Sequence, residues 1–592
     1  MSIRHFPAST LLCAILLAVA SISVCTTNTL YVRPEYNHGC PGEPCHTLSY
    51  YEQRVPKYFA SDTTMVFLNG THYLEIALVI RDIKNFIMIG SGGFTIGSED
   101  LHEAKSKIEC VGTNVSGFNF IEVTGIHIKN LTFAYCGQPE EVASEVHAAL
   151  AFNVAYNVNL SRVTVRNSCG FGLHVRMVFG SVQVYESVFL YNTGKKEYYG
   201  GNALFWYGEC PENRSAYLEI ESSSFLHGND TSKESHLYHT SATGLTLLIQ
   251  CPAITVSINN ITMVGNQAEN GGGNLAINFT DFTSNYPYYG PEVPNVVINN
   301  SRITNGTGNR GGGLRVWSKI LSTFKEEILR NQALSERCIL LISNTQFVGN
   351  FAHSGGGALY ISHYETNQTD YITRQISLMN CTFSGNTIPP SGSGAAINVI
   401  KYKILGYIPH VSPQFETIFQ NCSFSKNSLL HDKRGTFIGA TVDIFTMEKV
   451  TFKHCNFANN NSKALSLVDS NLVLDGHILF DGNHAINGGA LRFCDTSVVY
   501  IQNSTHIKFY NNHAKNAGGA IYAQQQCLDM TPPCFFQPVA DDFTKIADLK
   551  KWMSLTFVNN TVIVLCMVVQ LSTATHTYSL KTILIQATTT PI

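Results

Sequence analysis

Closely spaced cysteine pairs are the residues of this chain that are best suited to metal or redox chemistry. Cys40 and Cys45 enclose the segment CPGEPC, and Cys527 and Cys534 enclose CLDMTPPC. Such pairs either ligate zinc or form local disulfides. A structural zinc site needs a second pair of Cys or His at a matching spacing, and neither segment has one. Because prolines bend the chain between the cysteines, we predict a local disulfide in each segment.

Histidines and carboxylates are the other candidates for metal or acid–base chemistry. His454, His477 and His506 each stand three residues before a recurring aromatic position, so stacked strands could align them to bind a metal or to titrate together. Unrelated surface histidines are the simpler interpretation. Asp541 and Asp542 form an adjacent acidic pair of the kind that glycoside hydrolysis needs, but we interpret them as solvated loop residues. The sequence therefore predicts no catalytic, cofactor-binding or metal-binding residue.

A repeated phrase indicates how the chain positions its residues. A polar residue, often Asn, precedes an aromatic by three positions, and an Asn follows that aromatic by three, as in NCTFSGN (380–386), NCSFSKN (421–427) and HCNFANN (454–460). Alternating apolar residues lead into the phrase, which is typical of β-strands. The spacing is about two dozen residues, with insertions, and this period indicates one coil of a parallel β-solenoid. We expect the solenoid to extend over residues 63–560.

Alternation also predicts which side chains point inward. The residue two positions before the aromatic shares its face, and in three successive coils this residue is Cys381, Cys422 or Cys455. Strands stacked about 4.8 Å apart would place these thiols in an interior ladder. Two neighbours could form a disulfide and leave the third cysteine unpaired, or all three could serve as small buried hydrophobes.

Asparagines mark the outer face and the turns. Asn130, Asn260, Asn380 and Asn421 begin glycosylation sequons three positions before the aromatic, and we expect both sequon residues to point outward. Glycans on adjacent coils would crowd each other at Asn380 and Asn421. The asparagines three positions after the aromatic should adopt left-handed backbone at a turn and stack by hydrogen bonding. They are Asn350, Asn386, Asn427, Asn483 and Asn512.

Glycines follow the phrase, as in SGGGALYI (354–361) and NGGALRF (487–493). We expect them to supply positive φ just before the next strand. A phosphate-binding loop is the alternative, but no Lys-Ser or Lys-Thr follows these glycines and no helix pattern opens there.

Composition bounds the partners and the compartment. The chain has 592 residues with 39 Lys and Arg against 42 Asp and Glu, a net charge of −3, and no basic stripe that would favour nucleic acid or an anionic membrane. Residues 1–25 have the layout of a secretory signal peptide, whose alternative is a membrane anchor. Residues 26–62 would form an N-terminal cap. The hydrophobic tail 561–592 lies outside the pattern, and we interpret it as a truncated or alternative end.

The pairing of FxxN with Gly-Gly-Ala, as in residues 347–359, 480–491 and 509–521, resembles the repeat of the polymorphic outer membrane proteins of chlamydiae. The whole chain resembles right-handed parallel β-helix proteins of the pectin-lyase-like superfamily, particularly large secreted β-helix proteins of simple animals. The resemblance implies an all-β, right-handed parallel β-helix. It implies little about function, because that superfamily hosts lyases, hydrolases, adhesins and passive scaffolds.

Three functional hypotheses follow. The first is a secreted or cell-surface scaffold, without catalysis or cofactor, that binds an extracellular protein or a glycan. The second is a polysaccharide lyase or glycoside hydrolase on the same fold. The third is a cell-envelope adhesin of the autotransporter type that lacks its barrel, which would place the protein in a bacterial envelope.

Overall fold

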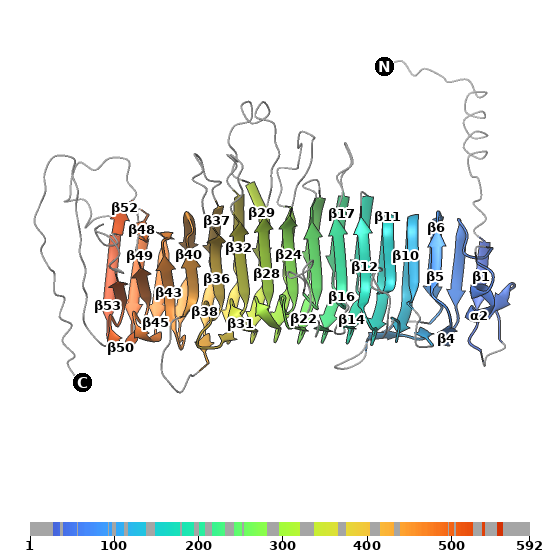
Figure 1. Ribbon diagram of the computed structural model, residues 1–592, viewed down its shortest axis with the longest axis horizontal. Coiled ribbons are helices and arrows are strands. Elements are labelled where there is room, and N and C mark those ends of the chain that lie inside the picture. The colour runs from blue at the N-terminus through green and yellow to red at the C-terminus, as the bar shows by residue number, and fades with distance from the viewer. Residues whose placement is uncertain are drawn as a thin grey trace, which may run out of the picture.

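The computed structural model shows one long stack of short parallel strands that runs from β1 at the blue end to β53 at the red end (Figure 1). The structure describes residues 28–35, 39–55, 57–92, 94–96, 102–111, 116–137, 148–177, 180–194, 200–207, 216–230, 242–250, 254–280, 295–319, 337–364, 374–402, 415–430, 439–494, 497–502, 505–524, 536–538 and 553–560. Its strands form one 42-stranded sheet, a 7-stranded sheet and two 2-stranded sheets. The predicted all-β parallel β-helix is confirmed.

The first coils carry the cap and two unusually long strands. Their elements are β1 (Asn28–Val32), β2 (Cys45–His46), α2 (Leu48–Glu52), β3 (Thr63–Phe67), β4 (Gly70–Leu74), β5 (Leu78–Arg81), β6 (Lys84–Gly90), β9 (Ser106–Cys110), β10 (Phe118–Ala134) and β11 (Ala148–Arg166), with the antiparallel pair β7 (Phe94–Ile96) and β8 (His102–Ala104). β1 already pairs in parallel with β3. Within the described residues, the parallel sheet is therefore already present at Asn28, inside the segment 26–62 that was expected to form the cap.

Each later coil contributes three strands to the large sheet, and each strand pairs with its equivalent in the next coil. The first face, called here the lead face, consists of β13 (Gly180–Tyr185), β17 (Ala216–Glu221), β21 (Ile254–Asn259), β25 (Val296–Asn299), β29 (Arg337–Ser343), β33 (Arg374–Met379), β37 (Phe415–Gln420), β41 (Lys449–Lys453), β44 (Asn471–Asp475), β48 (Val498–Ile501) and β52 (Phe536–Pro538).

The second face, called here the phrase face, holds the repeated aromatic. Its strands are β14 (Val188–Leu190), β18 (Ser224–Leu226), β22 (Thr262–Val264), β26 (Arg302–Thr304), β30 (Gln346–Val348), β34 (Thr382–Ser384), β38 (Ser423–Ser425), β42 (Asn456–Ala458), β45 (His477–Asp481), β49 (Thr505–Tyr510) and β53 (Met553–Val558).

The third face, called here the glycine-led face, follows the glycine turns. Its strands are β12 (Phe171–Met177), β16 (Gly201–Tyr207), β20 (Leu245–Ile249), β24 (Leu275–Thr280), β28 (Leu314–Lys319), β32 (Leu359–Tyr364), β36 (Ile397–Tyr402), β40 (Ala440–Phe445), β43 (Lys463–Val468), β47 (Leu491–Cys494) and β51 (Ile521–Gln524).

Short strands line the corner between the phrase face and the glycine-led face. The 7-stranded sheet consists of β15 (Thr193–Gly194), β19 (Asn229–Asp230), β23 (Gln267–Ala268), β27 (Thr307–Arg310), β31 (Phe351–Gly355), β35 (Thr387–Ile388) and β39 (Ser428–Leu429), and β46 (His484–Asn487) pairs separately with β50 (His513–Ala517).

Stacked phenylalanines fill the core of the phrase face. Phe347, Phe383, Phe424 and Phe457 are fully buried, and the ring centroids of successive residues lie 4.9, 5.0 and 4.6 Å apart with nearly parallel planes. This spacing is that of the strands that carry them, so each ring covers the next. The aromatic of the repeat is therefore a packing residue.

The asparagine after each aromatic joins a buried ladder of side-chain amides. The Asn386 amide donates to the Phe347 carbonyl and to Asn427 Oδ1, both at 3.0 Å, while its Oδ1 accepts from the Asn350 backbone and side chain, also at 3.0 Å. Asn386 itself is fully buried. The same pattern recurs at Asn427, Asn460, Asn483 and Asn512.

Two coils have glycine in place of the turn asparagine, and an asparagine at the start of the glycine-led face replaces the missing amide. At Gly306, the Asn274 amide donates to Asn350 Oδ1 at 3.2 Å and to the Thr304 carbonyl at 3.1 Å. At Gly228, Asn202 fills the same role. A Cβ at Gly306 would lie 2.4 Å from Asn274 Nδ2. Glycine is therefore required at position 306 to leave room for the Asn274 side-chain amide.

The expectation of left-handed backbone at the five turn asparagines is wrong, because none of them has positive φ. Positive φ falls on the residue before them, as at Gly349 (65°) and Gly385 (64°). Positive φ also falls three residues before the aromatic, as at Asn380 (53°), where the chain bends between β33 and β34. Because the turn asparagine keeps ordinary backbone, its side chain can point inward to the ladder.

Cys381, Cys422 and Cys455 lie in the core as free thiols, each at most 2% exposed. Each sulfur donates to a carbonyl of its own coil and to one of the preceding coil. A hydrogen bond with Cys422, followed by burial, raises the pKa of the Cys381 thiol well above its ordinary value. The Cys381 thiol therefore remains protonated at neutral pH, which makes it a poor nucleophile.

Two disulfides join described cysteines. Cys40–Cys45 pins the N-terminal cap, as predicted, with the Cα atoms 6.2 Å apart. Cys110–Cys136 links β9 to the end of β10 with a Cα separation of 4.9 Å, and the sequence analysis missed it. Cys136 stands three residues after Phe133, where later coils have the turn asparagine. A disulfide therefore secures this corner before the amide ladder begins.

The cap also buries one carboxyl group. Glu52 at the end of α2 is 4% exposed, and its Oε1 accepts a hydrogen bond from the Glu75 backbone at 3.0 Å. Burial, opposed by that hydrogen bond and reinforced by Glu75 and Glu35, raises the pKa of Glu52 to about 7.

Within the described residues, no helix is long and apolar enough to cross a membrane.

Replacing Asn386 with Ala should lower the free energy of unfolding by about 3 kcal/mol. The substitution removes the hydrogen-bond partner of the buried Phe347 carbonyl and of the Asn350 backbone N–H. Denaturant unfolding measures this change. Asn344→Gly is the matched control, since Asn344 is exposed with φ of 49° and glycine adopts that backbone readily. Equal destabilisation by both substitutions would contradict the structural role of the buried ladder.

Alkylation should separate the cysteines into two groups. We expect Cys381, Cys422 and Cys455 to resist iodoacetamide in the native protein and to react in denaturant, because burial shields them. Peptide mapping by mass spectrometry should find Cys40–Cys45 and Cys110–Cys136 linked throughout. A disulfide within the thiol ladder would contradict this assignment.

Glu52 should make the protein less stable as pH rises. Between about pH 4.5 and 7 the unfolded chain loses the proton that the folded chain retains, so the free energy of unfolding falls across this window and then levels off. Glu52→Gln should remove this part of the pH dependence and keep the acceptor for the Glu75 N–H. Glu122→Gln, at an exposed position, should leave the profile unchanged.

Candidate functional site

The predicted glycosylation asparagines occupy the bend before the phrase face. Asn260, Asn380 and Asn421 are exposed, and the Asn421 amide donates to Asn380 Oδ1 at 3.2 Å. At Asn130 the expected outward sequon is wrong for one member, because Thr132 is fully buried and accepts a hydrogen bond from the Ala104 backbone of β8. Glycosylation of these asparagines stays a prediction.

The structure brings the three histidines together, contrary to the interpretation as unrelated surface residues. The rings of His454 and His477 lie 5.7 Å apart, and those of His477 and His506 lie 5.1 Å apart. All three are exposed at the bend into the phrase face. The described residues nevertheless contain no group of three or more His, Cys, Asp or Glu that could hold a metal ion.

A pair of carboxylates on the lead face is the feature closest to what the enzyme hypothesis needs. Glu219 and Glu221 alternate on β17 and both point outward, with a separation of about 7 Å expected along the strand. Glu219 accepts hydrogen bonds from Tyr185 and from the Gln183 amide. The pair Asp541 and Asp542 lies outside the described residues, as do Cys527 and Cys534.

The outward side of the glycine-led face carries a cluster of aromatic and basic side chains, of which Arg315 and Tyr360 are buried and the others are half-buried. We name this cluster the aromatic face, and its residues are Arg310, Arg315, Trp317, Tyr360, Tyr364 and Tyr402. Tyr364 and Tyr402 are directly paired and stacked, with centroids 4.7 Å apart, and Trp317 lies 5.2 Å from Tyr364. Three aromatic rings on β28, β32 and β36 therefore form a continuous platform.

Guanidinium groups flank this platform. Arg310, from the corner strand β27, donates to the Tyr402 hydroxyl at 3.4 Å and lies 5.4 Å from the Tyr360 ring centroid. The ion pairs of the described residues do not include Arg310. Burial, followed by the charge of Arg310, lowers the pKa of Arg315 to about 10, so the Arg315 guanidinium stays cationic at neutral pH.

The tyrosine hydroxyls are coupled to each other. The Tyr360 and Tyr402 oxygens lie 2.7 Å apart in a hydrogen bond. Burial, followed by this bond, raises the pKa of Tyr360, and burial raises the pKa of Tyr364. Both phenols therefore stay protonated at physiological pH and can donate or accept hydrogen bonds.

A second tryptophan lies in the same file of outward residues. Strand pairing aligns Trp206 with Leu248, Leu248 with Asn278, and Asn278 with Trp317. Three strand steps of about 4.8 Å separate the two indoles by about 14 Å along the solenoid axis. Arg176 lies 4.9 Å from the Trp206 ring, whose Nε1 donates to Gln250 at 3.0 Å. Tryptophan with a neighbouring arginine therefore occurs twice in one line.

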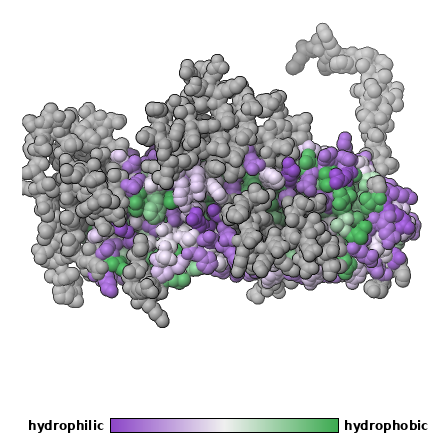
Figure 2. All heavy atoms as spheres, in the orientation of Figure 1, coloured by the Kyte–Doolittle hydropathy of each residue, from purple (hydrophilic) through white to green (hydrophobic). Residues whose placement is uncertain are grey.

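Sequence reasoning missed the aromatic face. Its signal is alternation in which the outward positions are aromatic or basic, as in LRVWSK, LYISHY and GNALFWY. Figure 2 shows hydrophilic residues over much of the described surface and hydrophobic residues at several places, among them the N-terminal end.

Comparison with known proteins gives one family match and several structural neighbours. Residues 506–524 match the Chlamydia polymorphic membrane protein repeat, and no curated protein sequence matches the chain. A tailspike protein mutant of E. coli bacteriophage HK620 is 12% identical, with 90% of this chain and 78% of that chain covered and a TM-score of 0.38.

Two further neighbours are enzymes. The catalytic unit of a GH87 alpha-1,3-glucanase from Streptomyces thermodiastaticus is 13% identical over 85% of this chain, with a TM-score of 0.32, and this chain spans 64% of its length. The mannuronan C-5 epimerase AlgE6 A-module of Azotobacter vinelandii is 12% identical, covering 70% of this chain and 85% of that chain at a TM-score of 0.27. These likenesses concern the fold alone. The chain is a parallel β-helix protein that carries a repeat of the Chlamydia polymorphic membrane protein type.

Proposed function

We propose that this protein is a secreted or cell-surface β-helix scaffold that binds a glycan along the aromatic face without cleaving it. The observation that carries the proposal is the single outward file that holds Trp206 and Trp317, each beside an arginine. An aromatic ring offers a flat apolar surface on which the C–H face of a sugar ring can stack. Nearby guanidinium and hydroxyl groups supply the hydrogen bonds that sugar oxygens require.

The geometry favours an extended ligand that lies along the solenoid axis. Trp206 and Trp317 stand about 14 Å apart in one line, so a compact monosaccharide would reach only one of them. Between them in the same file, Leu248 is half-buried and Asn278 is fully buried, so a ligand would make its contacts mainly at the two indoles. A chain of several sugar units is long enough to stack on both indoles at once.

The charge of the aromatic face favours a ligand with acidic groups. Arg310 lies against Tyr360 and Tyr402 rather than in an ion pair of the described residues. A carboxylate or sulfate on the glycan would complete its hydrogen bonding in a bidentate contact.

A protein partner is the second candidate for the same surface. Tryptophan, tyrosine and arginine are the residues that most often anchor protein interfaces, and all three occur here. A surface location is supported by the two disulfides, which persist in oxidising compartments, and by the repeat at residues 506–524. We prefer a glycan because Trp206 and Trp317 lie in one line along the solenoid axis, which suits a linear chain of sugars, and are not gathered in one pocket.

Binding to acidic and neutral oligosaccharides of increasing length tests the proposal. We expect Trp317→Ala and Trp206→Ala each to weaken binding of a long acidic oligosaccharide about tenfold, which corresponds to about 1.4 kcal/mol. Tyr217→Ala is the matched control, because Tyr217 is an exposed aromatic on the lead face. Isothermal calorimetry measures affinity, and chromatography of the ligand afterwards detects cleavage.

Each result has a clear meaning. Binding that is lost equally in Tyr217→Ala, or no binding to any glycan, would contradict the glycan proposal and direct the search to protein partners. Cleavage that disappears in Glu219→Gln would instead support the enzyme hypothesis, with Glu219 and Glu221 as its carboxylates.

A further inference from the structure

Two exposed histidines face each other on neighbouring strands of the phrase face. His477 in β45 is directly paired with His506 in β49. Their ring centroids lie 5.1 Å apart and the ring planes differ by 13°. Both side chains point outward, away from the core. Two imidazoles are thus held in register by the backbone of a rigid sheet.

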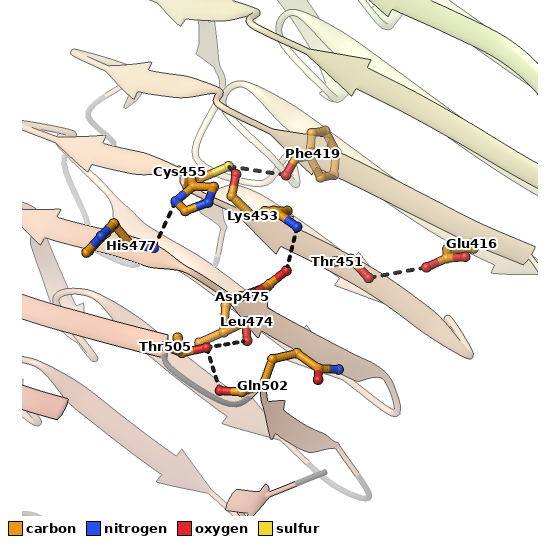
Figure 3. A network of polar contacts seen from close by, with 11 residues as sticks. Glu416, Phe419, Thr451, Lys453, Cys455, Leu474, Asp475, His477, Gln502 and Thr505 are labelled. Atoms are coloured by element: carbon orange, nitrogen blue, oxygen red, sulfur yellow. Dashed lines mark hydrogen bonds and ion pairs between the residues drawn. The ribbon is translucent and has the colours of Figure 1, made fainter. Parts of the chain in front are cut away.

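A third histidine is adjacent but is committed to another contact. The His477 backbone N–H donates to Nδ1 of His454 at 3.1 Å, and Figure 3 shows this contact beside Cys455 and Lys453. The ring lies over Gly476, where an added Cβ would come within 2.2 Å of it. An Nδ1 that accepts a hydrogen bond leaves the proton of a neutral imidazole on Nε2. His454 therefore lacks a free lone pair, while His477 and His506 keep theirs.

Imidazole nitrogen is a preferred ligand of nickel, copper and zinc dications, at about 2.0 to 2.1 Å for zinc. Two nitrogens bound to one tetrahedral ion lie about 3.4 Å apart, which is closer than the present ring spacing. Rotation about the side-chain torsions of His477 and His506 can bring the ring nitrogens together, because both side chains are exposed. The strand pairing already fixes the distance between the Cα atoms of the two histidines.

The neighbouring charges are nearly balanced. Asp475, two residues before His477, pairs with Lys453 at 3.0 Å (Figure 3). Lys508 points outward two residues after His506, and the Asp481 carboxylate accepts from the Asn511 amide at 3.0 Å. The neighbouring charged groups therefore do not strongly repel a cation at the two histidines. Both nearby carboxylates, Asp475 and Asp481, already have partners.

We propose that His477 and His506 form a two-ligand site for a nickel, copper or zinc dication, with water in the remaining coordination positions. The site is separate from the aromatic face, because it lies on the phrase face near the C-terminal end of the stack. It does not depend on the proposed glycan binding.

A second histidine pair must be removed to isolate this site. His484 is paired with His513, with centroids 5.7 Å apart and planes at 46°. The test therefore uses the full chain with His484→Ala as the background. Nickel is titrated by calorimetry at pH 7.5, and copper binding is followed by its visible absorption.

In this background, His477→Ala and His506→Ala should each weaken nickel affinity at least tenfold relative to the background protein, whereas His454→Ala should change it less than threefold. Affinity should also fall at about pH 5, because protons compete with the metal for the imidazoles. Circular dichroism confirms that each variant remains folded. Metal affinity that is unchanged in His477→Ala, or an equal loss in His454→Ala, would overturn the two-histidine site.

Discussion

The buried amide ladder is the interaction on which the rest of this structure depends. Each rung satisfies a carbonyl of the preceding coil and a backbone N–H at the same corner, as Asn386 does for Phe347 and Asn350. These groups are buried, and a buried polar group without a partner costs about 1–3 kcal/mol. The rungs meet only when coils stack in register. Register in turn sets the phenylalanine stack and the thiol ladder, because each identical residue then lies over its equivalent.

Much of this architecture could be predicted from the sequence, since its information is local. The aromatic, the residue two before it and the asparagine three after it belong to one short segment, and alternation alone places Phe383 and Cys381 inside. The substitution of Asn274 for the amide missing at Gly306 could not be predicted in the same way. Its partner, Asn350, stands 76 residues further along the chain. Only the three-dimensional register shows that Asn274 makes the hydrogen bonds that a turn asparagine at position 306 would have made.

The candidate sites lay beyond sequence reasoning for a related reason. Trp206 and Trp317 share a file only through three successive strand pairings, and insertions of unequal length separate those strands in the sequence. The three histidines were visible as a recurrence, yet their contacts depend on local backbone. Gly476 supplies φ of 70°, which bends the chain so that the His477 N–H reaches the His454 ring. Sequence spacing raised the alignment of these histidines only as the less favoured alternative, and it could not indicate which of them is hydrogen-bonded.

The outward charges are arranged differently on the lead face and on the aromatic face. On the lead face, basic residues pair with carboxylates on neighbouring strands, as Lys453 does with Asp475 and Lys449 with Glu416 at 2.8 Å. The half-exposed pair Lys453–Asp475 contributes little stability, but both pairs neutralise charge on this face. On the aromatic face, Arg310 lies against tyrosine rings instead of a carboxylate of the described residues. Because outward positions do not enter the amide ladder, this face could acquire aromatic and cationic residues while the core repeat stayed the same.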